Sequence, residues 1–291
     1  MSGSLRVAVV GTGRMGSAMV GRLVDAGHDV SVFNRTKSRA AALAEEHGIA
    51  VAPTAREAAS SADVVVVSLA DDAAVRAAYL GADGLVAGLR AGTVVADTST
   101  VDPATIHALG DDVARVGATL IDTPVSGSVS SVQSGKLLVM AGGDEAALAR
   151  AQPVLDAFAS RVISLGALGS GATMKLVVNS MVHGLNAALA EALVLAEKAG
   201  VVRSAAYEVI ASSAVAAPFV LYKRAAYENP DDTPVAFALD LVAKDLDLAA
   251  TLAARVGADV PQLVTNRAVV QRAIEAGLGQ ADLSALATLL R

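Results

Sequence analysis

Three glycines near the N-terminus have the spacing of a turn that binds nucleotide phosphates. Gly11, Gly13 and Gly16 fit the pattern G-x-G-x-x-G and follow an apolar run over residues 5–10. In this pattern the first glycine permits a tight turn, the second lets the backbone approach a pyrophosphate, and the third lets the helix pack closely on the strand. A helix over 14–26 would aim its free N–H groups at the phosphates. The motif therefore predicts a dinucleotide site, with a glycine turn in another kind of βαβ unit as the alternative.

The residues after the next predicted strand, 29–33, bear on which dinucleotide is bound. NAD-binding units place an acidic residue there, and it accepts hydrogen bonds from the ribose hydroxyls. Here the sequence is Asn34-Arg35-Thr36, with Arg39 nearby. A carboxylate would repel the 2′-phosphate of NADP, whereas a guanidinium pairs with it through a charge-assisted fork. The sequence favours NADP (NADPH) and leaves NAD open; the alternative is that Arg35 is an ordinary basic residue at a helix start.

Further polar groups follow predicted strands or lie on predicted helices. The stretch DTPVSGS follows a strand, and Ser126 with the N–H groups around Gly127 could cradle a carboxylate. In GSGATMKLVVN, Lys175 and Asn179 are four residues apart and therefore share a helical face. A lone helical lysine is usually solvated, but the residues flanking Lys175 are mostly apolar. Thr100 closes the stretch DTST after another strand.

Two more polar positions lie further along the predicted helices. His183 extends the face of Lys175 and Asn179 by one turn, and it could contact a substrate or be a hydrogen-bonded packing residue. Lys244 is followed by Asp245 on a later helix. The chain has no cysteine, which excludes thiolate catalysis and a disulfide framework. None of these groups requires a metal.

The predicted elements place these residues in two domains, a dinucleotide-binding domain over 1–167 and an all-α domain over 168–291. The first has strands that alternate with helices, which predicts an α/β fold with a Rossmann-type, doubly wound parallel sheet and ligands at the carboxyl ends of its strands. The expected strands are 5–10, 29–33, 64–68, 93–96, 118–121, 136–140 and 162–165. A long helix over 172–198 joins the domains, and the helices expected after it are 204–213, 218–227, 235–256 and 261–276.

Composition narrows the class of protein. The net charge of −6 over 291 residues gives no support for nucleic-acid binding, which shows a basic patch or stripe. The first strand begins after about four residues, which leaves no room for a signal peptide, and no apolar run reaches the roughly 18 residues of a membrane span. We therefore expect a cytoplasmic protein that handles small molecules. The apolar surface of the helices after residue 169 predicts a homo-oligomer, a dimer or a tetramer.

Together these motifs resemble the β-hydroxyacid dehydrogenase family, and the resemblance covers nearly the whole chain. The family includes 3-hydroxyisobutyrate dehydrogenase, tartronate semialdehyde reductase and the glyoxylate and succinic semialdehyde reductases, and it is related to 6-phosphogluconate dehydrogenase. The resemblance implies an oxidoreductase that transfers hydride between a nicotinamide cofactor and a small β-hydroxy acid or aldehyde-acid. Two alternatives stay open: an imine reductase of the same fold, which usually lacks a lysine at position 175, and a cofactor-binding scaffold without catalysis.

The resemblance also implies roles for individual residues. Lys175 matches the catalytic lysine, which donates a proton to the carbonyl oxygen as hydride arrives, or removes it in the oxidative direction; desolvation can lower the pKa of such a lysine toward the working pH. The residues that match substrate contacts are Ser126, Gly127, Ser128, Asn179 and Lys244. The residues that match the cofactor site are Gly11, Thr12, Gly13, Arg14, Met15, Gly16, Asn34, Arg35, Thr36, Leu69, Ala70, Ala74, Thr100 and Lys244.

Some positions depart from the family's pattern. Ser128 stands where many relatives have a second glycine, Ala70 where they have a proline, and Lys136 where a small or polar residue is expected. Ser128 resembles the semialdehyde-reductase branch, whereas Asp122 and Gly142-Gly143 resemble the hydroxyisobutyrate branch. These mixed features leave the substrate and the physiological direction open, and not the type of reaction.

Overall fold

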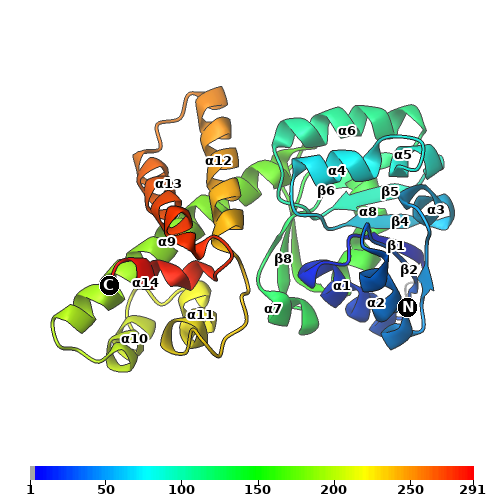
Figure 1. Cartoon of the computed structure of the whole chain (residues 1–291). Coiled ribbons are helices and arrows are strands. Elements are labelled where there is room, and N and C mark those ends of the chain that lie inside the picture. The colour runs from blue at the N-terminus through cyan, green and yellow to red at the C-terminus, as the bar shows by residue number, and fades with distance from the viewer. Residues whose placement is uncertain (1–3) are drawn as a thin grey trace. The chain divides into compact units, whose positions relative to one another are not determined.

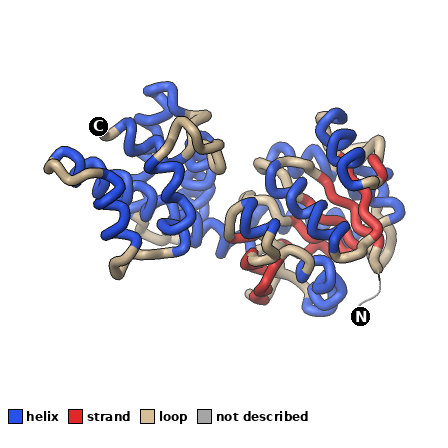
Figure 2. Tube along the Cα trace, turned by 90° about the horizontal axis from the view of Figure 1, so that it is seen from below, coloured by secondary structure: helices blue, strands red, loops and turns tan. Residues whose placement is uncertain are grey.

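The computed structural model describes residues 4–291, and the chain divides into two compact units, Met1–Lys175 and Leu176–Arg291 (Figure 1). Figure 2 shows strands in the first unit, while the second consists of helices and loops. The division falls inside helix α9 (Ser170–Lys198), which is the long helix expected over 172–198. The α/β fold with a second, all-α part is therefore present.

The main sheet of the first unit has six parallel strands in the order β3-β2-β1-β4-β5-β6. Their bounds are β1 (Arg6–Val10), β2 (Asp29–Phe33), β3 (Ala50–Val51), β4 (Val64–Val67), β5 (Val94–Asp97) and β6 (Thr119–Asp122). The chain builds outward from β1 to β3 and then resumes on the other side of β1 with β4. This reversal between β1 and β4 is the switch point at which open parallel sheets bind ligands.

Helices alternate with these strands, and several begin where the sequence supplies a cap. Asp102 caps α6 and is followed by Pro103 at the first helical position. Asp71 accepts a hydrogen bond from the N–H of Ala74 and so caps α4. The helices of this unit before α9 are α1 (Arg14–Asp25), α2 (Lys37–His47), α3 (Ala55–Ser61), α4 (Asp72–Tyr79), α5 (Leu85–Gly88), α6 (Pro103–Arg115), α7 (Val129–Gln133) and α8 (Glu145–Asp156).

The last strands of the first unit form a separate small sheet, which corrects the expectation of one continuous parallel sheet. Strand β8 (Leu137–Ala141) pairs antiparallel with β7 (Val125–Ser126) and parallel with β9 (Ala159–Ser164). Directly after β8, Gly142 forms an antiparallel bridge with Asp122 at the end of β6. Strand β8 therefore runs against the direction of β6, and it cannot extend the main sheet as another parallel strand.

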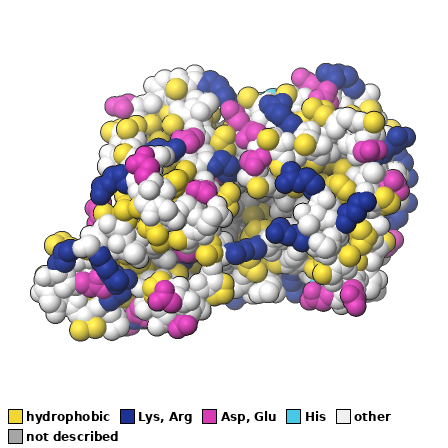
Figure 3. Space-filling view, in the orientation of Figure 1, with side chains coloured by type: hydrophobic (Ala, Val, Ile, Leu, Met, Phe, Trp, Pro, Cys, Tyr) yellow, Lys and Arg dark blue, Asp and Glu magenta, His cyan; other side chains and the backbone are white. Residues whose placement is uncertain are grey.

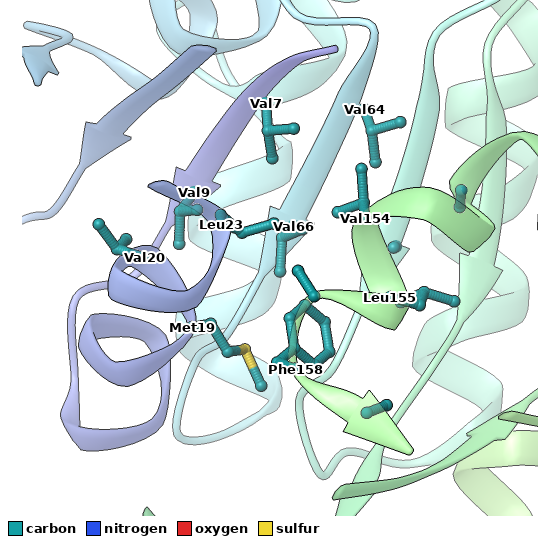
Figure 4. Packing of buried hydrophobic residues seen from close by; sticks show 14 of the residues in the cluster. Val7, Val9, Met19, Val20, Leu23, Val64, Val66, Val154, Leu155 and Phe158 are labelled. Atoms are coloured by element: carbon teal, nitrogen blue, oxygen red, sulfur yellow. The ribbon is translucent and has the colours of Figure 1, made fainter. Parts of the chain in front are cut away.

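The core of the first unit explains why its strands are apolar on both faces. Val7 and Val9 of β1 point to one side of the sheet, while Ala8 and Val10 belong to a second cluster on the other side. Figure 4 shows the first cluster, in which side chains from β1 and β4 meet side chains from α1 and α8. The labelled residues are Val7, Val9, Met19, Val20, Leu23, Val64, Val66, Val154, Leu155 and Phe158. Both faces of the central strands are thus covered.

The second unit packs helices around the later turns of α9. Its elements are α10 (Arg203–Ala211), α11 (Pro218–Glu228), α12 (Leu239–Val256), α13 (Pro261–Ala273), the π turn η1 (Ile274–Leu278), the 3-10 turn η2 (Leu283–Ala285) and α14 (Leu286–Leu289). Residues 176–291, all of which the structure describes, contain no strand beyond a single bridge between Ala238 and Asp282. The helix expected over 261–276 is α-helical as far as Ala273 and continues into the π turn η1, where Gly277, whose φ of +83° favours glycine, interrupts the helical backbone.

Helix α9 is long and apolar enough to cross a membrane, as judged by length and composition, so the expectation that no segment reaches that length is wrong for it. Its side chains show a different role. Leu176, Leu189 and Leu193 lie in the hydrophobic core of the second unit, and Asn186 is buried and donates a hydrogen bond to the carbonyl of Leu283. These contacts are those of the central helix of a helical domain.

The surface of the second unit carries many large hydrophobic side chains. Figure 3 shows hydrophobic side chains, in yellow, on the face of this unit that is turned to the viewer. Met181, Leu195 and Val202 are each at least 70% exposed, and Val209 and Val264 are more than 60% exposed. Among the described residues of the first unit, the most exposed large hydrophobic residue is Val51, at 42%.

A buried ion pair holds the connection between α11 and α12. Lys223 Nζ lies 2.7 Å from Asp282 Oδ1, and the other oxygen of Asp282 accepts hydrogen bonds from the N–H groups of Ala236 and Phe237. Burial alone would raise the pKa of Asp282, but the hydrogen bond and charge of Lys223 hold it below its ordinary value of 3.8. The stabilisation from this carboxylate is therefore present above that ordinary value and is lost as the pH falls below it.

We predict that Lys223→Met destabilises the protein by about 3–5 kcal/mol, because it leaves the buried carboxylate of Asp282 without its cation. Thermal unfolding followed by circular dichroism measures the loss. Lys198→Met removes an exposed lysine from the same unit and should change stability by less than about 0.5 kcal/mol. If the two substitutions lower the stability equally, the buried pair of Lys223 and Asp282 does not have the predicted effect on stability.

Candidate active site

The glycine turn after β1 has the geometry that its motif predicts. Gly11 has a φ of +101°, and a Cβ there would lie closer than 3.0 Å to the carbonyl oxygen of Ser68. A Cβ on Gly16 would come equally close to the carbonyl oxygen of Gly11, so the third glycine lets α1 pack on the turn. A Cβ on Gly13 would meet no protein atom within 4 Å. Protein packing explains the first and third glycines, and close approach of a ligand explains the second.

The start of α1 offers groups that fit a dinucleotide phosphate. Gly13 is the N-cap and supplies no side-chain hydrogen bond, so the first N–H groups of the helix are available. The hydroxyl of Thr12 is buried and has no hydrogen-bond partner among the described residues. The N–H of Thr12 donates to Asn34 Oδ1 at 3.0 Å, which ties the turn to the end of β2. These residues fit a nicotinamide dinucleotide at this turn.

The segment after β2 places its cations on the surface. Asn34 Nδ2 donates to the carbonyl of Thr36, which closes a short turn around Arg35. Arg35, Thr36 and Arg39 are all exposed. Arg35 directly follows Asn34, the residue at the end of β2 that is hydrogen-bonded to the glycine turn. This is where the ribose of a dinucleotide lies in folds of this type.

The turns after β4 and β5 are joined to each other. The N–H of Leu69 donates to Ser99 Oγ at 3.0 Å, so the predicted cofactor residues Leu69 and Thr100 lie on neighbouring loops. The N–H of Ser99 donates to Asp97 Oδ1, and the Tyr79 hydroxyl donates to Asp97 Oδ2, both at 2.8 Å. Burial raises the pKa of Asp97 to about 6, and these hydrogen bonds oppose the shift. In the sequence, Asp97 is visible only as the first residue of the stretch DTST. Its hydrogen bonds to Ser99 and Tyr79 could not be predicted from that stretch.

The start of α9 is fixed by a buried carboxylate. Asp122, at the end of β6, accepts hydrogen bonds from the N–H groups of Gly169 at 2.8 Å and Ala172 at 2.6 Å. It thereby satisfies N–H groups at a helix start, where a negative charge is favourable. Burial raises the pKa of Asp122, and the hydrogen bonds from Ala172 and Gly169 oppose that shift. The helix that carries Lys175 is therefore held at its first turn.

Lys175 is half-buried and faces the predicted substrate loop. Its Nζ donates to the carbonyl of Val125 at 2.8 Å, next to Ser126 and Gly127. Gly127 has a φ of +137°, which favours glycine, and Ser128 caps α7 in a capping box with Ser131. The structure therefore brings Lys175 together with the Ser126–Gly127 loop, although 50 residues separate Lys175 from Val125. The solvated-lysine alternative does not hold.

In the second unit, Asn179 and Lys244 share one buried partner. Asn179 Nδ2 donates to Asp245 Oδ2 at 2.5 Å, and Lys244 Nζ lies 2.9 Å from Asp245 Oδ1. Asp245 is 1% exposed. Burial alone would raise its pKa, but His183 and the charge of Lys244 hold it below its ordinary value. The carboxylate of Asp245 therefore orients Asn179 and Lys244, the two predicted substrate contacts that lie in the second unit.

His183 is buried, and it is not the hydrogen-bonded packing residue that one of the two alternatives expected. Its ring lies 5.8 Å from that of Phe237, centroid to centroid. Its Nε2 lies 3.6 Å from Asp245 Oδ2, which is longer than a hydrogen bond. Neither ring nitrogen has a hydrogen-bond partner among the described residues. The 3.6 Å distance nevertheless shows that His183 faces the carboxylate of Asp245, which orients Asn179.

Comparison with known proteins agrees with these features. Residues 6–166 match the family model for the NAD-binding domain of 6-phosphogluconate dehydrogenase. Residues 169–290 match the family model described as NAD-binding of NADP-dependent 3-hydroxyisobutyrate dehydrogenase. The chloroplastic glyoxylate/succinic semialdehyde reductase 2 of Arabidopsis thaliana is 32% identical over 99% of this chain and 80% of its own length.

Solved structures with the same fold cover nearly the whole chain. The 3-hydroxyisobutyrate dehydrogenase of Mycobacterium tuberculosis, solved with L-serine, has a TM-score of 0.86 at 32% identity and covers 99% of this chain and 100% of its own. Psf3, solved in complex with NADP+ and 2-OPP, has a TM-score of 0.90 at 25% identity and covers 98% and 100%. The glycine turn, the Lys175 helix and these relatives lead to one conclusion: the chain belongs to the β-hydroxyacid dehydrogenase family of NAD(P)-binding oxidoreductases.

Proposed function

We propose that the protein is an NADP-preferring hydroxyacid dehydrogenase or semialdehyde reductase. Its substrate would be a small β-hydroxy acid of the 3-hydroxyisobutyrate type, or the matching aldehyde-acid. The observation that carries the proposal is the hydrogen bond from Lys175 Nζ to the carbonyl of Val125, at 2.8 Å, beside the Ser126–Gly127 loop. A half-buried ammonium next to a loop that can hold a carboxylate is the pair of groups that this reaction needs.

Each group then has a defined task. The nicotinamide, when bound, supplies or accepts the hydride. Lys175 would donate a proton to the substrate's carbonyl oxygen during reduction and remove it from the hydroxyl during oxidation. Ser126 and the N–H groups around Gly127 would bind the substrate carboxylate, and Val125, through its carbonyl, keeps the Lys175 ammonium beside that loop. Asn179 and Lys244 stay predicted substrate contacts, with their orientations set by Asp245.

Two other functions are less well supported by the same residues. An imine reductase of this fold usually lacks a lysine at position 175, and here that lysine is present and hydrogen-bonded to the substrate loop. A scaffold without catalysis would have no need for a half-buried Lys175 or for the Asn179–Asp245 hydrogen bond. A cytoplasmic location stays a prediction.

We predict that Lys175→Ala lowers kcat by about 10²- to 10⁴-fold, the usual contribution of a general acid or base, without loss of cofactor binding. The assay follows NADPH consumption with a panel of small semialdehydes and keto acids. Lys175→Arg should also be strongly impaired, because a guanidinium does not readily give up its proton. Lys198→Ala, at an exposed lysine, serves as the control.

Two outcomes would contradict this assignment. If Lys175→Arg restores most of the activity, Lys175 acts only as a fixed positive charge and not as the proton donor. If the wild-type protein oxidises NADPH with cyclic imines but with none of the aldehydes or keto acids, the imine reductase alternative replaces the proposal.

We predict that Arg35 provides much of the preference for NADP. Arg35→Ala should weaken NADPH binding roughly tenfold or more, because it removes a charge-assisted contact to the 2′-phosphate, and should leave NADH binding little changed. Titration of nicotinamide fluorescence measures both dissociation constants. Arg115→Ala, at an exposed arginine of α6, is the control. Equal losses for both cofactors would show that the 2′-phosphate binds elsewhere.

We predict a homo-oligomer, a dimer or a tetramer, held by the second unit. The support is the set of large hydrophobic side chains that this unit exposes, among them Met181 at 74% and Leu195 at 72%. Large apolar patches rarely stay in contact with water. Light scattering at micromolar concentration should give at least twice the 29.1 kDa of one chain. A monomer at that concentration would overturn the prediction.

A further inference from the structure

A buried carboxyl lies beneath the loops of the proposed cofactor site, and the hydride-transfer mechanism does not use it. Asp97 ends β5 and is 0% exposed. Tyr79 of α4 faces it with a donated hydrogen bond, and Asp122 lies beside it on β6, in register. These are the titratable groups that face Asp97 from the elements packed against it. A buried carboxyl between a phenol and a second carboxyl costs stability, so its presence calls for a function.

A chain of contacts runs from Asp97 to the loops that follow β5, β4 and β1. It accepts a hydrogen bond from the N–H of Ser99 at 2.8 Å, and Ser99 Oγ in turn accepts one from the N–H of Leu69 at 3.0 Å. The carbonyl of Ser68 and the side chain of Leu69 lie against Gly11, so closely that a Cβ on Gly11 would clash with both. The loops after β4 and β5 are therefore linked by hydrogen bonds through Ser99 to one carboxylate, and the loop after β1 packs directly against the loop after β4.

The ionised and neutral forms of Asp97 would hold these loops differently. Ser99 N–H and Tyr79 O–H both donate to the carboxylate, and hydrogen bonds to an ionised acceptor are the stronger kind. A protonated carboxyl is a neutral acceptor and carries one O–H donor; with the proton on Oδ2, that oxygen would face the Tyr79 hydroxyl donor to donor, and Ser99 N–H would keep only a neutral carbonyl acceptor. Protonation therefore weakens the anchoring of Ser99, and with it that of Leu69.

We propose that Asp97 is a positioning residue that, in its ionised form and through Ser99, holds the loops after β1, β4 and β5 in the arrangement that binds the nicotinamide cofactor. The proposal rests on the proposed function, because it takes these loops as the cofactor site. Cofactor affinity should then increase as Asp97 ionises, near pH 6, where burial and the neighbouring Asp122 place its pKa. The conversion of bound substrate should depend on Asp97 much less.

The test measures dissociation constants of NADH and NADPH by nicotinamide fluorescence between pH 5 and pH 8. NADH is the main probe, because the 2′-phosphate of NADPH titrates near pH 6 itself. For the wild-type protein, NADH should bind about threefold to tenfold more tightly at pH 7.5 than at pH 5, the range expected from one hydrogen bond. Asp97→Asn should abolish this pH dependence, because the side chain keeps its shape and loses its proton equilibrium.

Two more variants separate positioning from a general loss of structure. Tyr79→Phe removes a hydrogen bond that favours the carboxylate, so the midpoint of the NADH profile should move to higher pH. Ser99→Ala should weaken both cofactors at every pH, because it breaks the link to Leu69. Thr93→Val, at a buried hydroxyl just before the other end of β5, is the matched control and should leave the profile unchanged.

The melting temperature supplies a second measurement, which should change with pH in the direction opposite to the cofactor affinity. Because the folded-state pKa of Asp97 lies above its ordinary value of 3.8, its ionisation destabilises the fold as the pH rises toward 6. The melting temperature of the wild-type protein should therefore fall relative to that of Asp97→Asn over this range, while its cofactor affinity rises. If Asp97 had only a structural role, cofactor affinity would not rise with pH while the melting temperature falls.

The results distinguish the positioning role from the proposed function. If the NADH profile of Asp97→Asn titrates as the wild-type profile does, or if Thr93→Val has the same effect as Asp97→Asn, the positioning role is overturned even if hydride transfer is observed. If the binding profiles behave as expected but no hydroxy acid or aldehyde-acid reacts, the positioning role stands and the proposed function fails. If neither cofactor binds at any pH, both are overturned.

Discussion

The close packing of α9 on the ends of β6 and β8 is the constraint on which the candidate site depends. Asp122 satisfies N–H groups in the first turn of the helix, and a Cβ on Gly142 or Gly171 would come closer than 3.0 Å to atoms of Asp122 or Met140. Only glycine lets the helix start so near the strands. Because a helix is rigid over one or two turns, this start also determines where Lys175 projects, and Val125 then accepts its hydrogen bond.

Elements with a strong local pattern were predictable from the sequence, and elements defined by distant partners were not. The β1-α1-β2 unit and α9 follow from apolar periodicity and glycine spacing, and the structure has them within a few residues of the expected bounds. The short β3, α3, α5 and α7 were missed, because two to seven residues carry little periodicity. The separate sheet of β8 and β9 was also missed, since its direction is set by the bridge between Asp122 and Gly142, which no local pattern reveals.

The same distinction applies to the site. The glycine turn and the pair Lys175 and Asn179 are visible as spacings within a short stretch of sequence. Their partners are not, because Val125 and Asp245 lie 50 and 66 residues away from the side chains that they orient. Sequence patterns thus identified the residues proposed to contact ligands, while the structure was needed to find the carboxylates and carbonyls that hold them.

The buried aspartates fix the positions of their hydrogen-bond donors, and this role explains them better than a contribution to stability. Asp97, Asp122, Asp245 and Asp282 are each at most 9% exposed, and each accepts a hydrogen bond from backbone N–H groups or from a neighbouring polar side chain. Asp245 and Asp282 are paired with lysines, and replacing a buried charged pair by apolar residues of similar volume is often neutral or stabilising. Burial raises the pKa of Asp97 and Asp122, so stability alone does not explain these four carboxylates. A carboxylate with two oxygens can, however, fix two donors at once, as Asp245 does for Asn179 and Lys244. For three of the four, the donors lie on loops or helices of the candidate site. Directional hydrogen bonds are what a hydride-transfer site requires, because a displacement of about 1 Å can cost roughly a hundredfold in rate.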